Sequence, residues 1–395
     1  LGGDFKQDTD ILIADPKMDE SIRITFVGKK MQTVDVQELH GWRFGTLDAR
    51  KAKCVQFTER AECGIHAVNL YGMSHVNTPS EKNIYDVENI YVENCDETLS
   101  KDTRIENGTL KIIGAKLTAE GDFKTFKERV VMTEAALLVE GKMSGISSCV
   151  CSDTSDIMIK KKTRMSSGTF IFSGQCTFEC KQDVEINGGG FYSSQGFVQC
   201  VINGNFIQDG HVSIKEGEIH FKGDYIFNGY KWKRGDYIEY GKKCRVCFCG
   251  DRVQKVSTKD HDGVYWGQLD FSRSKGVCIQ DILVGYSLDG VDKIKSEKET
   301  LSLYMDIIHM DQDTVVEGDL ELQNSRLEIN EGSLHIKGSL KVLGYKVRIE
   351  SEKNILIDGN VEGGRELEIL LMGKSPERKK FEVGGEFNAT SGYLT

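Results

Sequence analysis

The sequence predicts an all-β protein, a right-handed parallel β-solenoid with coils of about 20 residues. Apolar and polar residues alternate along short runs, which is the pattern of a half-buried β-strand. Glycine ends many of these runs at a regular spacing. Proline is scarce, with 3 residues in the chain, as a nearly continuous sheet requires, because proline cannot donate to a strand ladder.

Two stretches show the repeating unit most clearly. Residues 327–340 read LEINEGSLHIKGSL, and residues 212–225 read VSIKEGEIHFKGDY. They align without a gap when Gly217 is placed on Gly332. Each stretch predicts a strand, a glycine turn and a second strand that ends at another glycine.

The glycines that close these units define the length of one coil. Gly121 and Gly141 are 20 residues apart, and Gly318 and Gly338 are also 20 residues apart. Leucine-rich repeats have a similar period but need a helix or a fixed asparagine ladder, and the sequence shows neither. The closing glycines are Gly121, Gly141, Gly204, Gly223, Gly318, Gly338, Gly359 and Gly385.

A longer repeat is superimposed on the coils. Residues 22–57 align without gaps on residues 244–279, an offset of 222 residues. The aligned pairs include Phe26 and Phe248, Gly28 and Gly250, Gln32 and Gln254, Val34 and Val256, Phe44 and Trp266, Gly45 and Gly267, Leu47 and Leu269, and Asp48 and Asp270.

This repeat suggests four segments. Residues 1–95 hold the first long-repeat segment and irregular coils, and residues 96–240 hold regular coils. Residues 241–313 hold the second long-repeat segment, and residues 314–395 hold regular coils that we expect to continue beyond the sequence. Residues 124–136 are the strongest candidate for a helix, but they also alternate, so we expect strands there.

Charge and hydropathy narrow the classes of partner. The net charge is −10, with 61 acidic and 51 basic residues, which argues against a nucleic-acid partner because phosphates need a basic stripe. No apolar run is long enough to predict a membrane span. The sequence opens on LGGDF without an initiator Met and stops on SGYLT in mid-pattern, so we expect a piece of a longer protein.

The chain has twelve cysteines, and three of them lie close together in CRVCFC, at Cys244, Cys247 and Cys249. Such a cluster can bind zinc or an iron–sulfur centre, but a structural site needs a second pair at matching distance, and none is present. The aligned segment IRITFV has no thiol. We therefore favour strand residues, with Cys247 and Cys249 on one strand face, and expect no metal or cofactor. The sequence leaves undecided whether cysteines of adjacent coils form disulfides.

Other cysteines fit the same interpretation. Cys149 and Cys151 would share one strand face, and Cys176, Phe178 and Cys180 would share another. A buried free cysteine behaves as a small apolar residue.

Acidic side chains gather at the glycine turns. We expect them to accept local backbone hydrogen bonds, as Asp does in turns. The alternative is a row of calcium sites, but the glycine-rich nonapeptide that supports such sites is missing. The residues concerned are Asp122, Asp224, Asp319 and Asp358.

Catalytic patterns are not evident. GxSxG, HExxH and P-loop motifs are absent. The histidines are scattered, and His220 and His335 occupy the same repeat position, which favours a structural role. We predict that the chain is not an enzyme and has no catalytic residues.

Aromatic residues offer one candidate binding surface. Phe44 and Trp266 are equivalent in the long repeat, and Trp42 and Tyr265 lie beside them. They would form either a carbohydrate-stacking patch or a packed corner of a wider coil, and we favour the packed corner.

The phrases NGTLKI, INGNFIQDGHVSI and EGDLELQNSRLEINEGSLHIKGSL, with the interposed YWGQLDF segment, resemble the β-solenoid arrays of very large surface or secreted proteins of Gram-positive anaerobes. These arrays are similar in design to filamentous-haemagglutinin-type adhesins and to the stalks of polymorphic toxins. The resemblance covers most of residues 96–395 and again 22–57. It implies an extended carrier that holds an adhesive or toxic tip away from the cell, and the high cysteine count departs from that pattern.

From the resemblance we expect a structural or adhesive stalk segment of a larger bacterial protein, located at the cell surface or outside the cell. Its partners would be neighbouring domains of the same chain and a host or cell-surface glycan or protein, with no nucleic acid and no membrane span. The alternative is a β-helix that binds or cleaves carbohydrate, because lyases and hydrolases of this architecture place carboxylates on one face of the stack.

Overall fold

The computed structural model describes residues 2–7, 22–36, 44–58, 65–126, 129–165, 168–228, 238–258, 264–372, 379–388 and 392–394. In these residues the chain is an all-β parallel β-solenoid with about 20 residues per turn. The predicted parallel β-solenoid with coils of about 20 residues is therefore confirmed. The chain divides into two compact units, residues 1–199 and residues 200–395.

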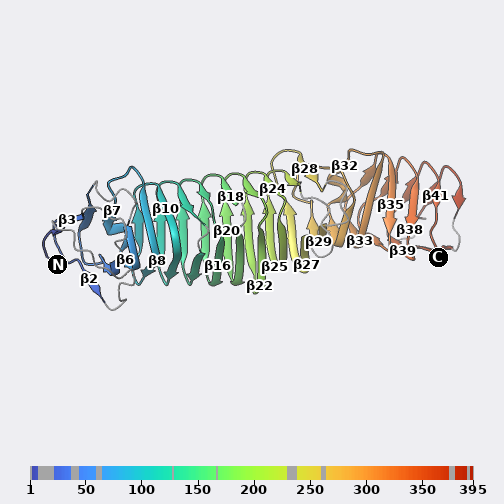
Figure 1. The fold of residues 1–395 in the computed structure, drawn as a ribbon. Coiled ribbons are helices and arrows are strands. Elements are labelled where there is room, and N and C mark those ends of the chain that lie inside the picture. Colours follow the sequence, from blue (N-terminus) through green and yellow to red (C-terminus); the bar gives the residue numbers. More distant parts are fainter. Residues whose placement is uncertain are drawn as a thin grey trace. The chain divides into compact units, whose positions relative to one another are not determined.

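In the first unit each strand pairs in parallel with the strand one turn further along (Figure 1). Leu117 pairs with Leu137, which pairs with Ile157, so equivalent residues are 20 positions apart. The regular part has three strands per turn, one on each side. The strands of one side are β2 (Arg23–Thr25), β4 (Phe44–Asp48), β6 (Ile65–Tyr71), β8 (Asn83–Glu93), β10 (Thr103–Ile113), β13 (Arg129–Thr133), β16 (Ser148–Asp153), β19 (Thr169–Gly174) and β22 (Gly190–Gln195).

Two further sides complete each turn of this unit. The second side holds β9 (Glu97–Leu99), β11 (Lys116–Ala119), β14 (Ala136–Val139), β17 (Asp156–Ile159) and β20 (Cys176–Cys180). The third side holds β12 (Phe123–Thr125), β15 (Met143–Ser144), β18 (Thr163–Met165) and β21 (Val184–Ile186), which follow the first residues of β10. A separate four-stranded sheet holds β1 (Phe5–Gln7), β3 (Met31–Val36), β5 (Cys54–Phe57) and β7 (Val76–Asn77). The boundary between the two units falls within β23 (Val198–Ile202).

Alternation decides which side chains fill the interior. In β14 and β17 every second residue is buried, and in β20 the buried residues include Cys176, Phe178 and Cys180. A fully buried aliphatic side chain of this kind contributes about 2 kcal/mol. The segment 124–136, the helix candidate, instead contributes to β12 and β13, as its alternation predicted.

The closing glycines are required by close approach between turns. A Cβ added at Gly141 would lie 2.4 Å from the carbonyl oxygen of Gly121. In the second unit the Gly338 amide donates to the Gly318 carbonyl oxygen at 3.1 Å. The glycine spacing read from the sequence is thus the spacing at which successive backbones touch.

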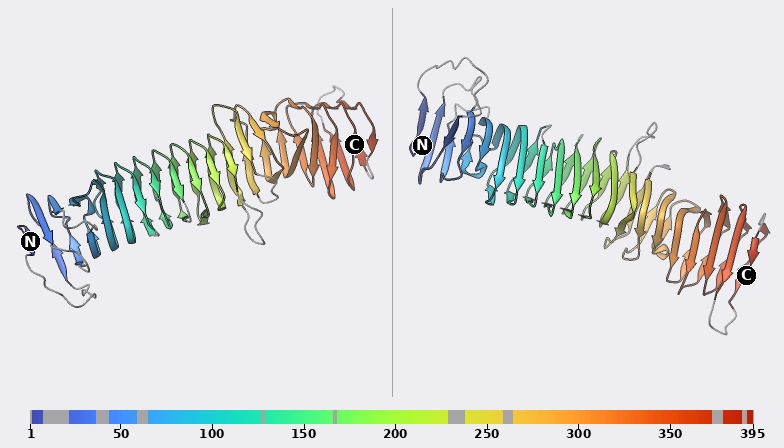
Figure 2. Two further views of the ribbon diagram at one scale, coloured as in Figure 1. Left: turned by 45° about the horizontal axis from the view of Figure 1, so that its top comes forward. Right: turned by 90° about the horizontal axis from the view of Figure 1, so that it is seen from below.

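The second unit begins with long strands that bend from one side to the next. They are β25 (His211–Phe221), β27 (Ile238–Phe248), β29 (Val264–Asp270), β31 (Leu283–Asp289) and β33 (Thr300–Met310). Their companions on the remaining side are β24 (Phe206–Gln208), β26 (Tyr225–Phe227), β28 (Gln254–Ser257), β30 (Val277–Ile279) and β32 (Ile294–Ser296). In each unit the strands follow one another in chain order, as the colours of Figure 2 show.

Three shorter ladders follow β33 in this unit. They are β36 (Arg326–Ile329), β39 (Lys346–Ser351), β42 (Glu366–Leu371) and β45 (Gly392–Leu394); β35 (Asp319–Gln323), β38 (Leu340–Leu343), β41 (Val361–Glu362) and β44 (Phe387–Asn388); and β34 (Thr314–Val316), β37 (Leu334–Ile336), β40 (Ile355–Ile357) and β43 (Phe381–Val383).

The two aligned stretches of sequence fold differently at their central glycines. Gly332 lies in a turn between β36 and β37, as predicted. The prediction is wrong at Gly217, because residues 211–221 form the single strand β25. The register of β25 against β27 shifts between Ile214 and Glu216, so the strand turns the corner by a bulge and needs no separate turn.

One ladder of the second unit is interrupted. Strand β32 ends the row that contains β30, and β34 begins a separate sheet. A hollow of about 450 Å³ lies at this interruption, and its lining includes Ile294, Lys298, Val315 and Glu317. The equivalent row of the first unit also ends, at β7, and β9 belongs to a different sheet.

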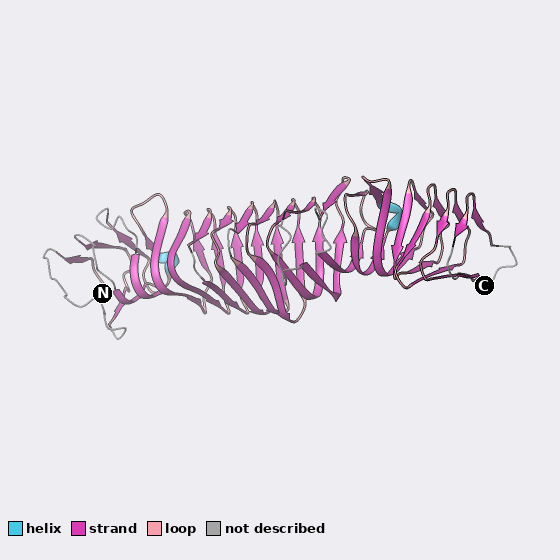
Figure 3. Cartoon of the chain, turned by 45° about the vertical axis from the view of Figure 1, so that its right-hand side comes forward, coloured by secondary structure: helices cyan, strands magenta, loops and turns pink. Residues whose placement is uncertain are grey.

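The likeness between the two aligned segments continues past them. Each is followed by a short 3₁₀ helix after a left-handed glycine and then by a short strand: η1 (Met73–His75) follows Gly72, and η2 (Val291–Lys293) follows Gly290 (Figure 3). We call residues 22–77 the first module copy and residues 244–296 the second. No helix among the described residues is long and apolar enough to cross a membrane.

Candidate functional site

The outer surface of β25 and β27 brings together three side chains that can bind a metal. Strand alternation turns Ile219 and Val246 into the core and leaves Glu218, His220 and Cys247 on the outward side. Their cross-strand register pairs His220 directly with Cys247. We call Glu218, His220 and Cys247 the ligand cluster.

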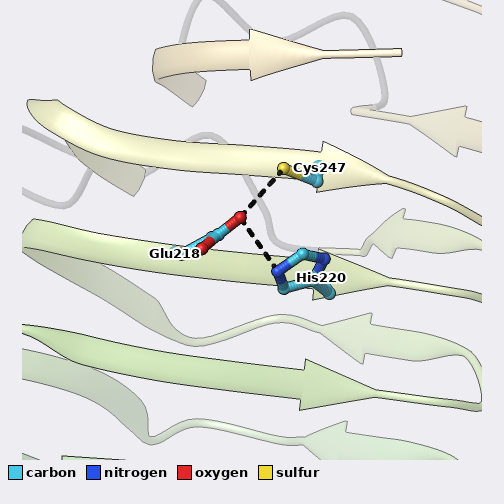
Figure 4. Close-up of side chains that lie close together, drawn as sticks. All are labelled: Glu218, His220 and Cys247. Atoms are coloured by element: carbon cyan, nitrogen blue, oxygen red, sulfur yellow. Dashed lines mark hydrogen bonds and ion pairs between the residues drawn. The ribbon is translucent and has the colours of Figure 1, made fainter. Parts of the chain in front are cut away.

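The ligand cluster is compact (Figure 4). Oε1 of Glu218 lies 3.1 Å from Nε2 of His220 and 4.0 Å from Sγ of Cys247. One ligand atom from each of the three residues lies within 4.8 Å of the others. A carboxylate, an imidazole and a thiol at this spacing are a donor set that fits zinc and other thiophilic divalent cations.

Two further groups face the ligand cluster. Cys249 Sγ lies 3.7 Å from Nδ1 of His220, on the side of the ring away from Glu218. On the next strand, Oδ2 of Asp270 lies 3.9 Å from Sγ of Cys247 and accepts a hydrogen bond from Arg245 at 2.6 Å.

Burial favours the neutral form of the Cys247 thiol. Desolvation, with a further contribution from the Asp270 charge, raises the pKa of Cys247 to about 12. Burial acts in the same direction on the pKa of Cys249. Although burial also acts to raise the pKa of Asp270, hydrogen bonds from Ser272 and Arg245 hold it below the usual range. The cluster thus combines a neutral thiol with an ionised carboxylate on its border.

The structure divides the cysteine motif found in the sequence. Cys247, in β27, and Cys249, just past its last residue, lie on the same outward side, as predicted. Cys244 points into the core, where it has no exposed surface, and burial raises its pKa to about 12. A site built from all three thiols is therefore ruled out by the strand geometry.

Sequence reasoning missed Glu218 and His220 as partners of these thiols. It grouped His220 with His335, but the two residues have different surroundings. His335 lies in β37, and its Nε2 is 2.9 Å from Oδ2 of Asp358. The signal that could have found them is the distance along the chain. His220 and Cys247 are 27 residues apart, which is the length of one coil at this point of the stack, so the two residues can lie side by side on adjacent strands.

The remaining cysteines are mostly interior residues. The eleven described cysteines are all free thiols, and Cys63 lies outside the described residues. Sγ of Cys149 and Sγ of Cys151 are 3.9 Å apart in the core of the first unit. These thiols fill space in the manner expected of small apolar residues.

The aromatic surface patch considered from the sequence is not present at Phe44 and Trp266. Phe44 is 2% exposed and Trp266 has no exposed surface, so both pack in the core. Trp266 stacks on Tyr240 with ring centroids 5.2 Å apart. Trp42 lies outside the described residues. The packed-corner interpretation is confirmed for the two equivalent residues.

The turn carboxylates accept hydrogen bonds, but their partners are not local. Oδ1 of Asp122 accepts the backbone N–H of Lys142 at 2.8 Å, and Oδ1 of Asp319 accepts that of Ser339 at 2.8 Å. Both partners are 20 residues downstream. The prediction of local bonds is wrong for these residues, because each carboxylate faces the backbone amide at the equivalent position of the next turn.

A second surface feature lies on the late turns of the second unit. Tyr345 is 66% exposed, and it borders a shallow hollow of about 400 Å³ with Asp306, Arg326, Lys346 and Arg348. An exposed aromatic ring beside hydrogen-bonding side chains is a surface on which a sugar ring can stack.

Comparison with protein-family models, with curated proteins and with solved structures finds no match to the chain.

Proposed function

We propose that the chain is a structural stalk segment of a larger bacterial cell-surface or secreted protein, located outside the cell, and that it holds neighbouring parts of that protein apart. The observation that carries the proposal is the repeated bond from one turn to the next. Asp102 accepts the amide of Asp122, and Asp122 accepts that of Lys142, each at 2.8 Å. Polar groups that could form a site are used to hold the stack.

Other contacts support a mechanical role. Oδ1 of Asp313 accepts the Ser333 amide, and Oδ1 of Asn360 accepts the Glu386 amide. In a solenoid, stability is a sum of such neighbour terms, so the body can be extended turn by turn. Its partners would be the adjoining domains and a surface glycan or protein at its tip, without nucleic acid.

Small-angle scattering of the full chain tests the stalk. A compact protein of this length would have a radius of gyration of about 21 Å. A stalk segment is expected to exceed that value clearly and to show the scattering of an elongated particle. A radius of gyration near the compact value would contradict the proposal.

A second candidate function, carbohydrate binding, is favoured by the hollow beside Tyr345. Titration with a panel of neutral and acidic polysaccharides tests it, together with an assay for newly released reducing ends. If the hollow binds a glycan, Tyr345→Ala should lower the affinity by about 2- to 10-fold, since a stacking ring contributes about 0.5–1.5 kcal/mol. Phe197→Ala is the matched control, because Phe197 is 43% exposed on the first unit. Equal binding by parent and Tyr345→Ala would remove the candidate.

A further inference from the structure

The ligand cluster lies on two neighbouring paired strands of the second unit, at a coil that is longer than the regular turns. Glu218 and His220 belong to β25, and Cys247 belongs to β27. The paired residues Gly217 and Cys244 are 27 positions apart, whereas a regular turn takes about 20. The cluster therefore spans the enlarged coil of this unit.

The fold does not require the thiols of this surface. In the first module copy, Thr25 and Val27 stand where the second copy has Cys247 and Cys249. The surrounding frame is the same in both copies, since Arg23 pairs with Asp48 as Arg245 pairs with Asp270. The thiols are thus an addition to a frame that forms without them.

The surroundings of Cys247 also point to a ligand. Its side chain is 1% exposed and is directed toward a carboxylate and an imidazole, although it lies on the outward side of its strand. Glu218 and His220 keep 32% and 17% of their side-chain surface exposed, so a small ion can reach the cluster from solvent.

We propose that Glu218, His220 and Cys247 form a binding site for one thiophilic divalent cation of the Zn²⁺ class. Oε1 of Glu218, Nε2 of His220 and Sγ of Cys247 supply three ligands, and solvent occupies the fourth position. The Cys247 thiol releases its proton to solvent on binding, because the thiolate is the ligand form. The bound ion cross-links β25 to β27.

Neighbouring residues have positioning roles in this site. Nδ1–H of His220 donates to Cys249, which fixes the ring so that Nε2 faces the ion. Arg245 neutralises Asp270, so the thiolate of Cys247 forms beside a compensated charge.

The test uses the full chain, purified under reducing, metal-free and anaerobic conditions and titrated with Zn²⁺ alone by calorimetry. The expected result is binding of one ion per chain. Cys247→Ser and His220→Ala should each weaken it by more than about 100-fold, and Glu218→Gln and Cys249→Ala by about 10- to 100-fold. Cys278→Ser is the thiol control and should bind as the parent does, because Cys278 lies on β30 beside Glu297.

A second measurement separates loss of binding from loss of fold. Loading with Co²⁺ should give thiolate-to-metal charge-transfer absorption, which Cys247→Ser abolishes and Cys278→Ser retains. Hydrogen exchange of β25 and β27 in metal-free Cys247→Ser should match the metal-free parent. The proposal is overturned by absence of one-to-one Zn²⁺ binding in the parent, or by unchanged affinity in Cys247→Ser.

Discussion

In the first module copy, Asp48 is bound by Arg23 and Arg50, whereas the equivalent Asp270 of the second copy is bound by Arg245 and Ser272. A hydrogen bond from a glycine amide to a buried glutamine is present in both copies. The Gly28 amide donates to Oε1 of Gln32 at 2.8 Å, and in the second copy Gly250 donates to Gln254 at 2.7 Å.

The copies differ in what lies outside that common frame. In the first copy, aromatic rings lie beside an arginine that binds the aspartate. Arg50 is 4.6 Å from the centroid of Tyr71, which stacks on Tyr91. The second copy surrounds it with Cys247 and, one strand further, the carboxylate and imidazole of the ligand cluster. The Arg–Asp pair and the buried glutamine therefore belong to the fold, and the residues that vary around them are where a function can reside.

The ends of the two copies differ as well. In the first copy the hydroxyl of Tyr85 lies 3.0 Å from the Met73 carbonyl oxygen, and Glu97 accepts the Ser74 amide at 2.8 Å. These two buried side chains fill the end of the ladder at β7. Leu303 and Thr314 occupy the corresponding inward positions of β33 and β34, and the second copy has a hollow at its interrupted ladder.

The largest expected effect comes from the glycine that precedes each 3₁₀ helix. A Cβ at Gly290 would lie 2.4 Å from the Ser272 nitrogen, and one at Gly72 would lie 2.7 Å from the Arg50 nitrogen. Both glycines have positive φ, 78° and 73°. Substitution by alanine should reduce the local free energy of unfolding by about 3 kcal/mol at Gly290 and about 2 kcal/mol at Gly72. Hydrogen exchange of the peptides that contain η2 and η1 measures this.

Gly114→Ala is the control for that pair. Gly114 has a φ of 57°, but its added Cβ would meet nothing within 4 Å. It should cost about 1 kcal/mol of conformational strain and no more. Equal losses at all three glycines would show that the contact with the neighbouring turn is irrelevant.

An intermediate effect is expected from acid. The hydrogen bond from Arg50, joined by that from Arg23, holds the pKa of Asp48 well below its usual value of 3.8. A lowered folded-state pKa gives stability that is present above the unfolded pKa and is lost as the pH falls below about 4. Arg50→Ser makes the first copy resemble the second, and it should remove about 1 kcal/mol at pH 7 because both arginines are partly exposed.

Hydrogen exchange of β4 at pH 7 and pH 3 measures the acid effect. The difference between parent and Arg50→Ser should shrink as Asp48 becomes protonated. Ser272→Arg, the reverse change in the second copy, serves as the comparison and should increase the acid sensitivity of β29. A difference that stays constant between the two pH values would contradict the assignment to Asp48.

The smallest effect is expected at Glu97. Burial raises the pKa of Glu97 above its usual value of 4.5, against the opposing hydrogen bond from Ser74. A raised carboxyl pKa means that stability is greatest below the unfolded pKa and is lost as the pH rises through the folded-state value. Glu97→Gln keeps an acceptor for the Ser74 amide and removes the charge, so it should stabilise η1 by about 0.5–1 kcal/mol at pH 8 and have little effect at pH 4. Local hydrogen exchange at the two pH values would disprove this if the Gln variant kept the parent's pH slope.

The length of the coil and the existence of the long repeat could be predicted from the sequence, since both are recognised from short residue patterns. The spacing of Gly121 and Gly141 reports the distance between touching backbones, and alternation reports which side chains are buried. The corner at Gly217 could not be predicted, because a bulge and a turn use similar residues and only the pairing partner distinguishes them.

The candidate site could be predicted only in part. The position of Cys247 and Cys249 on one face followed from alternation alone. Their proximity to Glu218 and His220 depends on the register between β25 and β27, and that register is set by a coil longer than the repeat. The partners of the turn carboxylates were mistaken for the same reason, since a local pattern does not reveal what lies one turn away.

The row of turn carboxylates has a consequence for how such a chain changes over generations. Asp102 presents to Asp122 the same acceptor that Asp122 presents to Lys142, each across 20 residues. Deleting the 20 residues from Asp122 to Gly141 would leave Asp102 facing the amide of Lys142 in the original geometry. Insertions and deletions of a whole turn are therefore tolerated far better than those of a few residues, and the length of this protein can drift in evolution in steps of one coil.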